Sequence, residues 1–449
     1  MYQLYRIACK QPETQDGAGK HIRGYPYNIQ CTGTGGDGNA GAEIIELQNP
    51  LPAENSTALI LALGENAANT YNTIWSHKPS HVILLYTPHD KNIQRLVQAI
   101  KGYKKLMPVA RITLYPVDIA GLKILDLPKP DAADIQVNIS PGTKGQGSFL
   151  SLWARKHGAV VYTNDKGFLK RLDDSSFASP MEAPPPNSYL RLAGFPLNPP
   201  GYDISLKTHE KSKFMLDFFR ACIKSNISLS DIFRRTIKVN GYKWKIGSHG
   251  QRGLQVPGRK KPVELAMQGK WFEQLVGYVM KDCGADDVQL RIRTDWNAEM
   301  REFLIERHQR ENEPHKIFMT DLDVTARFGS YYYVISCKTL FEQDNLKRDI
   351  NEVDAMASLF GRFGISMYCA FEYPGEPDDS VNKNVFVFGP KTFTNPEAMK
   401  QLLIRAREGR QTTKNPRKQG MVILNEGHFS KTRSRHLSDR PYSRGPAIR

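Results

Sequence analysis

The run Thr57-Ala-Leu-Ile-Leu-Ala-Leu63 begins the stretch of sequence that decides the fold. Two further runs of the same kind follow it, His81-Val-Ile-Leu-Leu-Tyr86 and Asp134-Ile-Gln-Val-Asn-Ile-Ser140. These runs are too apolar for strands with one face in water, and helix-length segments separate them. The pattern predicts an α/β domain in which helices cover both faces of a parallel sheet.

The same alternation continues along the chain and predicts a doubly wound domain. Strands are expected at 57–63, 81–86, 110–115, 134–140 and 159–163, with helices at 66–75, 92–103 and 145–157. Ligands of such sheets bind at the carboxyl ends of the strands, where the intervening loops converge. The candidate ligand-binding residues are therefore Gly64, Asn66, Asn69, Thr87, Ser140, Gly142, Thr143, Lys144 and Gly145.

The loop Ser140-Pro-Gly-Thr-Lys-Gly-Gln-Gly-Ser148 has the residue types that bind phosphate. Glycines let the backbone approach a ligand closely, N–H groups at a helix start bind anionic oxygens, and Lys144 adds a charge. A Walker A loop would need Lys and then Ser or Thr after Gly147, where this chain has Ser148-Phe149. The loop thus predicts phosphate binding without NTP hydrolysis, and an ordinary turn is the alternative.

A second α/β unit is predicted from Pro262 onward. Its elements are a helix at 263–281, strands at 288–293, 317–326 and 331–338, a helix at 346–360 and a strand at 365–372. Helix, strands, helix and strand in this order are typical of a compact α/β domain.

Charged residues within this second unit predict a catalytic site. Ser336 and Lys338 face the same way on one predicted strand, and Asp323 lies on its neighbour. Charged groups at the centre of a sheet cost folding free energy, so their presence there indicates a functional role. With Glu273 from the preceding helix and the main-chain carbonyl of Cys337, the group suits metal-assisted phosphodiester hydrolysis. A structural Asp–Lys pair is the alternative.

These residues resemble a known combination of domains. Ile139-Ser-Pro-Gly-Thr-Lys144 resembles the ligand loop of CARF domains, the CRISPR-associated sensors of cyclic oligoadenylates. Gly269-Lys-Trp-Phe-Glu273, Asp321-Leu-Asp323 and Ile335-Ser-Cys-Lys-Thr339 resemble the helix glutamate, central aspartate and lysine strand of PD-(D/E)xK nucleases. Ancillary effectors of type III CRISPR systems join the two domains in this order. The resemblance covers residues 57–170 and 262–375.

The resemblance implies a Rossmann-like CARF sensor domain followed by a restriction-endonuclease-like α/β domain. It also implies a homodimer in which cyclic oligoadenylate, expected to be cyclic tetra-adenylate, activates cleavage of DNA or RNA with Mn²⁺ or Mg²⁺ in antiviral defence. The metal would be held by Asp323, Glu273 and Cys337. One position departs from the family pattern, because Ser336 stands where Asp or Glu usually precedes the lysine by two residues. Glu352 on the next helix is a candidate replacement.

Length and charge agree with a multidomain protein that has a polyanionic partner. The 449 residues suffice for two or three domains, and the formal net charge is +16. The six cysteines form no C-x-x-C pair, so free thiols in a reducing compartment are expected. No apolar run reaches the roughly 18 residues of a membrane span, so we expect a cytoplasmic protein without a membrane partner.

The composition further divides the chain into five parts. They are a β-rich N-terminal extension of the sensor at 1–56, the sensor domain at 57–180, a Pro-rich linker with helices and a basic connector at 181–261, the nuclease domain at 262–390, and a basic tail at 391–449. The connector, with aromatic residues between its basic ones, is either a nucleic-acid channel or a solvated link.

Three other functions are less consistent with the sequence. The glycines at 33–38 match G-x-G-x-x-G but precede no long helix. The spacings Arg301…His308 and Arg310…His315 fit a HEPN-type ribonuclease, but they lie in a highly charged segment without an apolar face. A ligand-controlled DNA-binding regulator, with a helix-turn-helix at 210–237, explains the charge but gives Asp323 and Lys338 no role.

Overall fold

The computed structural model describes residues 42–47, 56–64, 66–118, 122–195, 197, 202–203, 206–228, 231–232, 234–246, 252–265, 269–293, 321–339, 343–373 and 385–412. All of them lie within one compact unit of the chain, Ala42–Arg449. The glycine stretch at 33–38, both Arg…His spacings and the tail beyond 412 lie outside the described residues.

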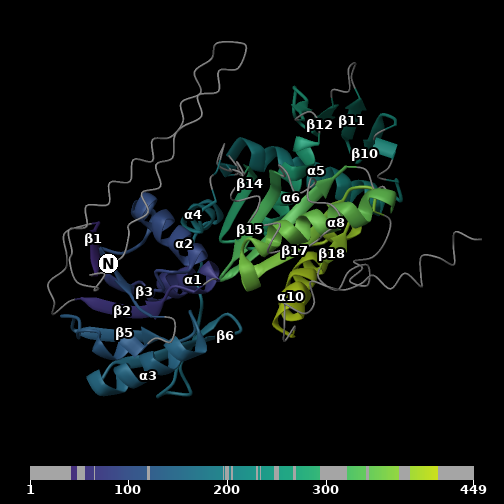
Figure 1. The fold of residues 1–449 in the computed structure, drawn as a ribbon. Helices are drawn as coiled ribbons and strands as arrows, with labels where there is room; N and C mark the ends of the chain where they lie inside the picture. The colour runs from purple at the N-terminus through teal and green to yellow at the C-terminus, as the bar shows by residue number, and fades with distance from the viewer. Residues whose placement is uncertain are drawn as a thin grey trace, which may run out of the picture. The chain divides into compact units, whose positions relative to one another are not determined.

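The first sheet has eight strands in the order β1-β4-β3-β2-β5-β6-β7-β8. Figure 1 shows β1, β2, β3, β5 and β6 of this sheet in purple to blue. Its strands are β1 (Glu43–Glu46), β2 (Thr57–Ala62), β3 (His81–Tyr86), β4 (Arg111–Pro116), β5 (Asp134–Asn138), β6 (Val160–Asp165), β7 (Phe168–Arg171) and β8 (Ala178–Pro180). The strands from β4 to β6 run parallel, and β1, β7 and β8 are antiparallel additions. The five parallel strands are those that the apolar runs predict.

Helices cover both faces of this sheet, because each central strand is apolar on both sides. Leu59 and Leu61 pack in one cluster with α1 and α2, whereas Ile60 and Ala62 pack in another with α3. The helices are α1 (Ala67–His77), α2 (Lys91–Gly102) and α3 (Lys144–His157), with short 3₁₀ turns η2 (Lys104–Leu106) and η3 (Leu122–Asp126). Each predicted helix of this region is confirmed to within two residues at either end.

The connector predicted at 181–261, together with the first residues of the predicted nuclease domain, folds into helices and a small antiparallel sheet. Its elements are α4 (Pro186–Leu192), β9 (Tyr202–Asp203), α5 (Leu206–Lys224), β10 (Ile237–Val239), β11 (Tyr242–Ile246), β12 (Arg252–Gln255) and β13 (Val263–Glu264). The small sheet has the order β10-β11-β12-β13. A type I′ hairpin at Asn240 and Gly241, with φ of 46° and 79°, joins its first two strands.

Two helix predictions here are wrong. Of the residues 210–237 expected to form a helix-turn-helix, the first helix ends at Lys224, because Asn226 adopts a left-handed φ of 52°. The described residues from there to β10 form no second long helix, so the helix-turn-helix is absent from them. The helix expected from Val263 begins at Lys270, since Val263 pairs with Leu254 in the small sheet and Gly269 turns with φ of 80°.

The second α/β sheet has six strands in the order β18-β17-β16-β15-β14-β9. Its elements are α6 (Lys270–Asp282), β14 (Asp287–Arg293), β15 (Asp321–Phe328), β16 (Tyr331–Lys338), α8 (Gln343–Ser358), η7 (Gly361–Phe363), β17 (Gly364–Ala370), β18 (Val385–Phe388), α9 (Pro390–Phe393) and α10 (Pro396–Thr412). Strands β14 to β16 are antiparallel and β16 to β18 are parallel. Helices α6, α8 and α10 pack against this sheet.

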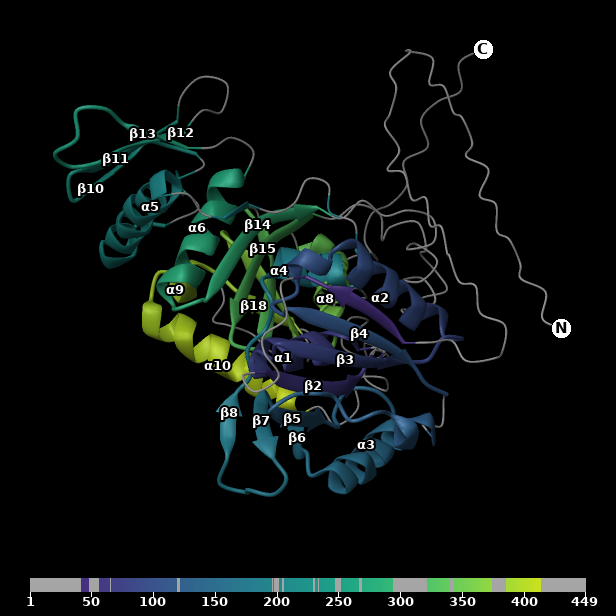
Figure 2. The same cartoon turned by 90° about the vertical axis from the view of Figure 1, so that its left-hand side faces the viewer.

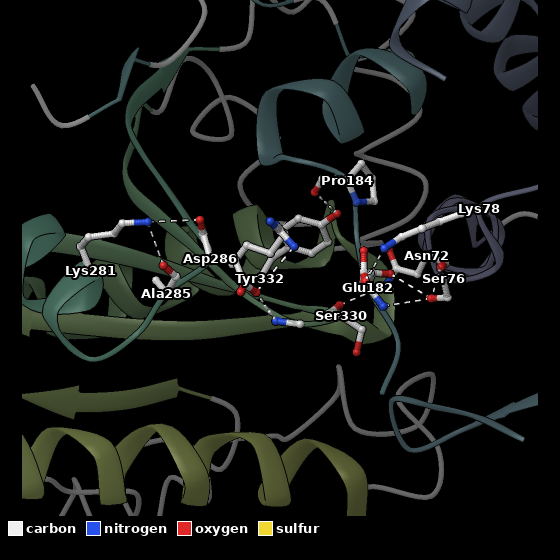
Figure 3. Close-up of polar contacts among 12 residues, drawn as sticks. Asn72, Ser76, Lys78, Glu182, Pro184, Lys281, Ala285, Asp286, Ser330 and Tyr332 are labelled. Carbon is white, nitrogen blue, oxygen red and sulfur yellow. Dashed lines mark hydrogen bonds and ion pairs between the residues drawn. The ribbon is translucent and has the colours of Figure 1, made fainter. Parts of the chain in front are cut away.

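The two α/β sheets share one hydrophobic core through the helices between them. Tyr189 of α4 stacks on Phe360 at 5.0 Å between ring centroids, and Phe360 stacks on Tyr332 of β16 at 4.3 Å. The hydroxyl of Tyr332 donates to the carbonyl of Pro184 at 2.9 Å (Figure 3). Within the described residues, no helix has the length and apolar character of a membrane span.

Candidate functional site

The loop between β5 and α3 meets the end of β2 backbone to backbone. Gly142 has a φ of 85°, and a Cβ added there would lie 2.5 Å from the Cβ of Ala62. A Cβ on Gly64 would lie 2.7 Å from the amide nitrogen of Gly142. Only glycine fits at both positions, so the convergence of these two predicted loops is confirmed.

The start of α3 is fixed by its own side chains and joined to the loop after β3. Thr143 and Gln146 form a capping box, in which the Thr143 hydroxyl accepts from the Gln146 N–H at 3.2 Å. The Gln146 amide also donates to the hydroxyl of Thr87 at 3.4 Å. Lys144 and Gly145 are exposed beside these contacts. The loop therefore presents a rigid, exposed helix start with one basic side chain.

Asn66 and Asn69 lie away from this exposed helix start. Asn69 is only 7% exposed, and its side-chain oxygen accepts from Asn164 at 3.0 Å and from Arg362 at 2.7 Å. Asn66 lies beside Gly361, with its side-chain oxygen buried and without a hydrogen bond, next to a cavity of about 20 Å³. A cavity of that size holds about one water molecule. In this conformation the side chains of both asparagines contact interior residues.

A continuous hydrogen-bond network runs from the loop to the second α/β sheet. The Ser140 hydroxyl accepts from the Asn164 N–H at 2.6 Å, and the Ser140 N–H donates to the side chain of Asn138 at 3.0 Å. Asn138 donates to the Asn164 side chain at 2.9 Å, and Asn164 in turn donates to Asn69. Arg362, which completes the network through Asn69, belongs to η7 directly before β17. We call these five residues the asparagine network.

Further contacts join the first sheet to the turn between β15 and β16. Asn72 donates to the carbonyl of Ser330 at 3.0 Å (Figure 3). Gly167 packs against Ser330 and Tyr331. The exposed pair Lys78–Glu182, at 2.8 Å, lies beside them. The N-terminal ends of β16 and β17 therefore lie next to the first α/β domain. Their C-terminal ends carry Lys338 and Ala370, which pair with each other.

At those C-terminal ends, Asp323 is held by a backbone hydrogen bond. Its carboxylate accepts from the N–H of Cys337 at 2.8 Å across the β15–β16 pair. Burial raises the pKa of Asp323 to about 6, although that hydrogen bond and the charge of Lys338 both act to lower it. The structure therefore places Asp323, Cys337 and Lys338 together, as the sequence predicts.

Glu273 reaches the same cluster from α6. Burial and the charge of Asp323 raise its pKa to about 7, while Arg291 acts in the opposite direction. The Glu273 carboxylate lies 2.9 Å from the Nε of Arg291, but the two atoms lack hydrogen-bond alignment. Two carboxylates that repel each other in a poorly solvated place gain from a bound cation.

Sequence reasoning missed Arg291. It adopts a left-handed φ of 55° inside β14, and the ladder pairs its neighbours Leu290 and Ile292 with β15 but leaves out Arg291 itself. Such a conformation costs roughly 1–3 kcal/mol in a non-glycine residue. No local sequence signal marks it, since an arginine within an apolar strand is usually a solvent-facing residue.

The donor set fits a divalent cation only in part. Among the described residues, no group of three or more His, Cys, Asp or Glu side chains is placed to hold a metal. Mg²⁺ is commonly bound through one or two carboxylates with water in the remaining positions, and Asp323 and Glu273 provide two. Burial raises the pKa of the Cys337 thiol, so this residue offers its main-chain carbonyl rather than a thiolate. These donors suit a hard cation.

Ser336 and Glu352 lie around Lys338. Ser336 is partly buried on β16, two residues before the lysine. Glu352 of α8 has its pKa raised by burial and lowered by Lys338, so it lies within the electrostatic reach of that lysine. Both positions therefore stay candidates for a further ligand of the cation.

Comparison with known proteins establishes the fold. No protein-family model and no curated protein matches the sequence. Protein VC1899 from Vibrio cholerae matches in structure with a TM-score of 0.51 at 13% identity, over 79% of this chain and 98% of that one. Can2 from Sulfobacillus thermosulfidooxidans, solved in complex with cyclic tetra-adenylate, matches with a TM-score of 0.50 at 16% identity, over 78% and 99%. The chain shares their fold.

Proposed function

We propose that the chain is a nuclease of type III CRISPR defence, activated by cyclic oligoadenylate. Residues 57–180 would form a Rossmann-like CARF sensor, and residues 262–390 a PD-(D/E)xK nuclease domain. The observation that supports this most is the cluster of two carboxylates, the partly buried Asp323 and the buried Glu273, beside Lys338. The shared fold with Can2, a protein solved with cyclic tetra-adenylate, supports the activator.

In the proposed reaction, each side chain has a separate task. Asp323 and Glu273 would hold Mn²⁺ or Mg²⁺ together with the carbonyl of Cys337 and water. When bound, the cation supplies Lewis-acid chemistry at the scissile phosphate. Lys338, whose charge acts on Asp323, would orient the attacking water as an ammonium, or receive the proton of that water as the neutral amine. Arg291 would hold Glu273 in place through the contact at 2.9 Å.

The exposed start of α3 would bind the activator. The backbone N–H groups of Gly142, Lys144 and Gly145 and the charge of Lys144 suit phosphate oxygens, whereas the N–H of Thr143 already donates to the side chain of Gln146 at 2.9 Å. A ring of repeating adenylates has rotational symmetry, so two copies of the sensor on a two-fold axis would each hold half of it. This predicts a homodimer, which sedimentation of the full chain would test.

The asparagine network offers a physical route between the two sites. Phosphate binding near Ser140 would change the hydrogen bonds of Ser140 to Asn138 and Asn164. Because Asn164 also bonds to Asn69, the change would reach the hydrogen bond between Asn69 and Arg362. Arg362 precedes β17, whose register brings Ala370 opposite Lys338. The seven residues from Gly364 to Ala370 span about 20 Å of strand. A shift of Arg362, just before β17, would therefore move a rigid strand whose other end lies beside Lys338.

A substrate screen tests the function. Plasmid DNA, single-stranded DNA and RNA are each incubated with Mn²⁺ and with cyclic tri-, tetra- or hexa-adenylate, or without activator. We expect one ring size to activate cleavage of at least one substrate. Absence of cleavage in every combination would contradict the proposal.

A further inference from the structure

The small sheet of the connector concentrates the positive charge of the chain. Residues 234–265 contain nine Lys or Arg and a single acidic residue, Glu264, a net charge of +8. The whole chain has a net charge of +16, so half of the excess lies in this one segment. Such a concentration is the electrostatic footprint of a polyanion-binding surface.

Strand pairing places lysines together on one face of this sheet. Lys238 of β10 lies directly opposite Lys243 of β11, and Lys245 follows on the same face. Like charges directly opposite each other destabilise a sheet. Within the described part of the chain, none of the three lysines pairs with a carboxylate, whereas Arg259 nearby pairs with Glu210 at 2.8 Å. We call Lys238, Lys243 and Lys245 the lysine face.

The opposite side of the sheet is buried, which fixes the lysine face toward solvent. Trp244 and Leu254 are fully buried, and the Trp244 ring stacks on Phe218 of α5 at 5.5 Å between centroids. Trp244 also contacts Trp271 of α6 at 6.0 Å, edge to face, two residues before Glu273. The small sheet is therefore anchored to α5 and to the start of the helix that carries Glu273 (Figure 2).

We propose that the lysine face binds the phosphate backbone of the nucleic-acid substrate. The inference rests on the proposed nuclease function for the identity of the polyanion. Lysines act as point charges toward phosphates and read no base sequence, so this surface would add affinity without sequence preference. The repulsion between Lys238 and Lys243 is relieved when a phosphate binds both, which explains why the chain tolerates the pair. A rigid contact with α6 would direct the bound strand toward Asp323 and Glu273.

The test measures binding without cleavage. A fluorescein-labelled single-stranded DNA, a duplex and an RNA are titrated with the full chain in EDTA, and fluorescence anisotropy is followed at several salt concentrations. The variant K238E/K243E/K245E is compared with K104E/K105E/K129E, which changes the net charge equally at exposed lysines that lie outside the strands of the first sheet. We expect the lysine-face variant to lose at least tenfold in affinity for one or more probes. Its log–log salt slope should fall by about 2–3, since each lost phosphate contact removes about 0.9.

The outcomes separate this inference from the proposed function. Equal losses in both triple variants, an unchanged affinity in the lysine-face variant, or no binding by the unaltered chain would each overturn it. Binding through the lysine face without cleavage under any activator would leave it standing and count against the nuclease. As an independent readout, Lys243→Gln should raise the melting temperature while weakening binding, because it removes the cross-strand repulsion. A lower melting temperature would contradict the account of the paired lysines.

Discussion

The helix start at residues 142–145 and the carboxylate cluster are built on opposite physical principles. The first is exposed and made mainly of backbone, with Gly64 and Gly142 in contact and Lys144 as its charged side chain. The second is poorly solvated, and burial raises the pKa values of Asp323 and Glu273. Under the proposed function, the first region would bind an anion at groups that already face solvent, whereas a cation at the second would relieve the repulsion between its two carboxylates.

The largest effect is expected at the carboxylate cluster. Asp323→Asn and Lys338→Ala should each reduce metal-dependent cleavage by roughly 10³-fold or more, and Glu273→Gln severely, because each removes a group acting on the phosphate, the cation or the water. Initial cleavage rates under activator measure this. Binding of cyclic tetra-adenylate, followed by calorimetry, should stay unchanged. Wild-type cleavage by either of the first two variants would show that the cluster is structural.

The exposed helix start should respond next. Lys144→Ala should weaken binding of cyclic tetra-adenylate by roughly 10–100-fold, as expected for the loss of a charged contact to phosphate. Calorimetry measures the affinity, and Lys129→Ala is the control at an exposed lysine outside this loop. Equal affinity in all three proteins would remove the loop from the binding site. Gly142→Val is a poor test, because its side chain would collide with Ala62 and destabilise the fold.

The asparagine network should have a smaller effect that joins the two regions. Arg362→Ala should retain the affinity for cyclic tetra-adenylate but lower activation about tenfold, within the usual range of coupling energies. Lys78→Ala is the control, since the Lys78–Glu182 pair at the same interface is exposed and contributes little. The ratio of cleavage rates with and without activator is the measurement. If both variants lowered it equally, general loosening of the interface would explain the result.

Sequence patterns predict the parts of this molecule that depend on neighbours along the chain. Apolar runs predict the central strands of the first sheet, and glycine spacing predicts the loop at Gly142. The asparagine network was missed, although Asn138 and Asn164 are polar residues at the ends of apolar runs and mark a buried polar cluster. Arg362 lies 293 residues further along the chain than its hydrogen-bond partner Asn69, and only packing brings the two together. For Arg291, the left-handed backbone conformation occurs where β14 leaves one residue out of its pairing with β15, and the local sequence does not encode that pairing.

A few-fold change is expected at Ser336. If no other carboxylate replaces the missing ligand, Ser336→Glu should lower the Mn²⁺ concentration needed for half-maximal cleavage about three- to tenfold, because an anionic oxygen is the better ligand. If Glu352 already fills that role, Ser336→Glu should slow cleavage and Glu352→Ala should nearly abolish it. Metal titrations of both variants decide between these cases. Unchanged Mn²⁺ dependence in both would exclude the two positions from the metal site.

The smallest effect concerns stability and pH. Because the folded-state pKa values of Asp323 and Glu273 are raised to about 6 and about 7, their contribution to stability is present below about pH 4 and is lost as the pH rises to about 7. Mn²⁺ should therefore raise the melting temperature more at pH 8 than at pH 5, by a few degrees. Thermal unfolding with and without Mn²⁺ measures this. The same increment in Asp323→Asn would place the metal elsewhere.

The central claim is that activator binding at the helix start controls cleavage at the carboxylates of Asp323 and Glu273. The most direct test titrates cyclic tetra-adenylate against the cleavage rate of wild type, Lys144→Ala and Asp323→Asn in Mn²⁺. We predict saturable activation of wild type and activation of Lys144→Ala shifted to roughly 10–100-fold higher activator with the same maximal rate. Cleavage by Asp323→Asn should stay roughly 10³-fold or more below that of wild type at every activator concentration. Cleavage by wild type that does not depend on activator, or an unshifted curve for Lys144→Ala, would contradict the central claim.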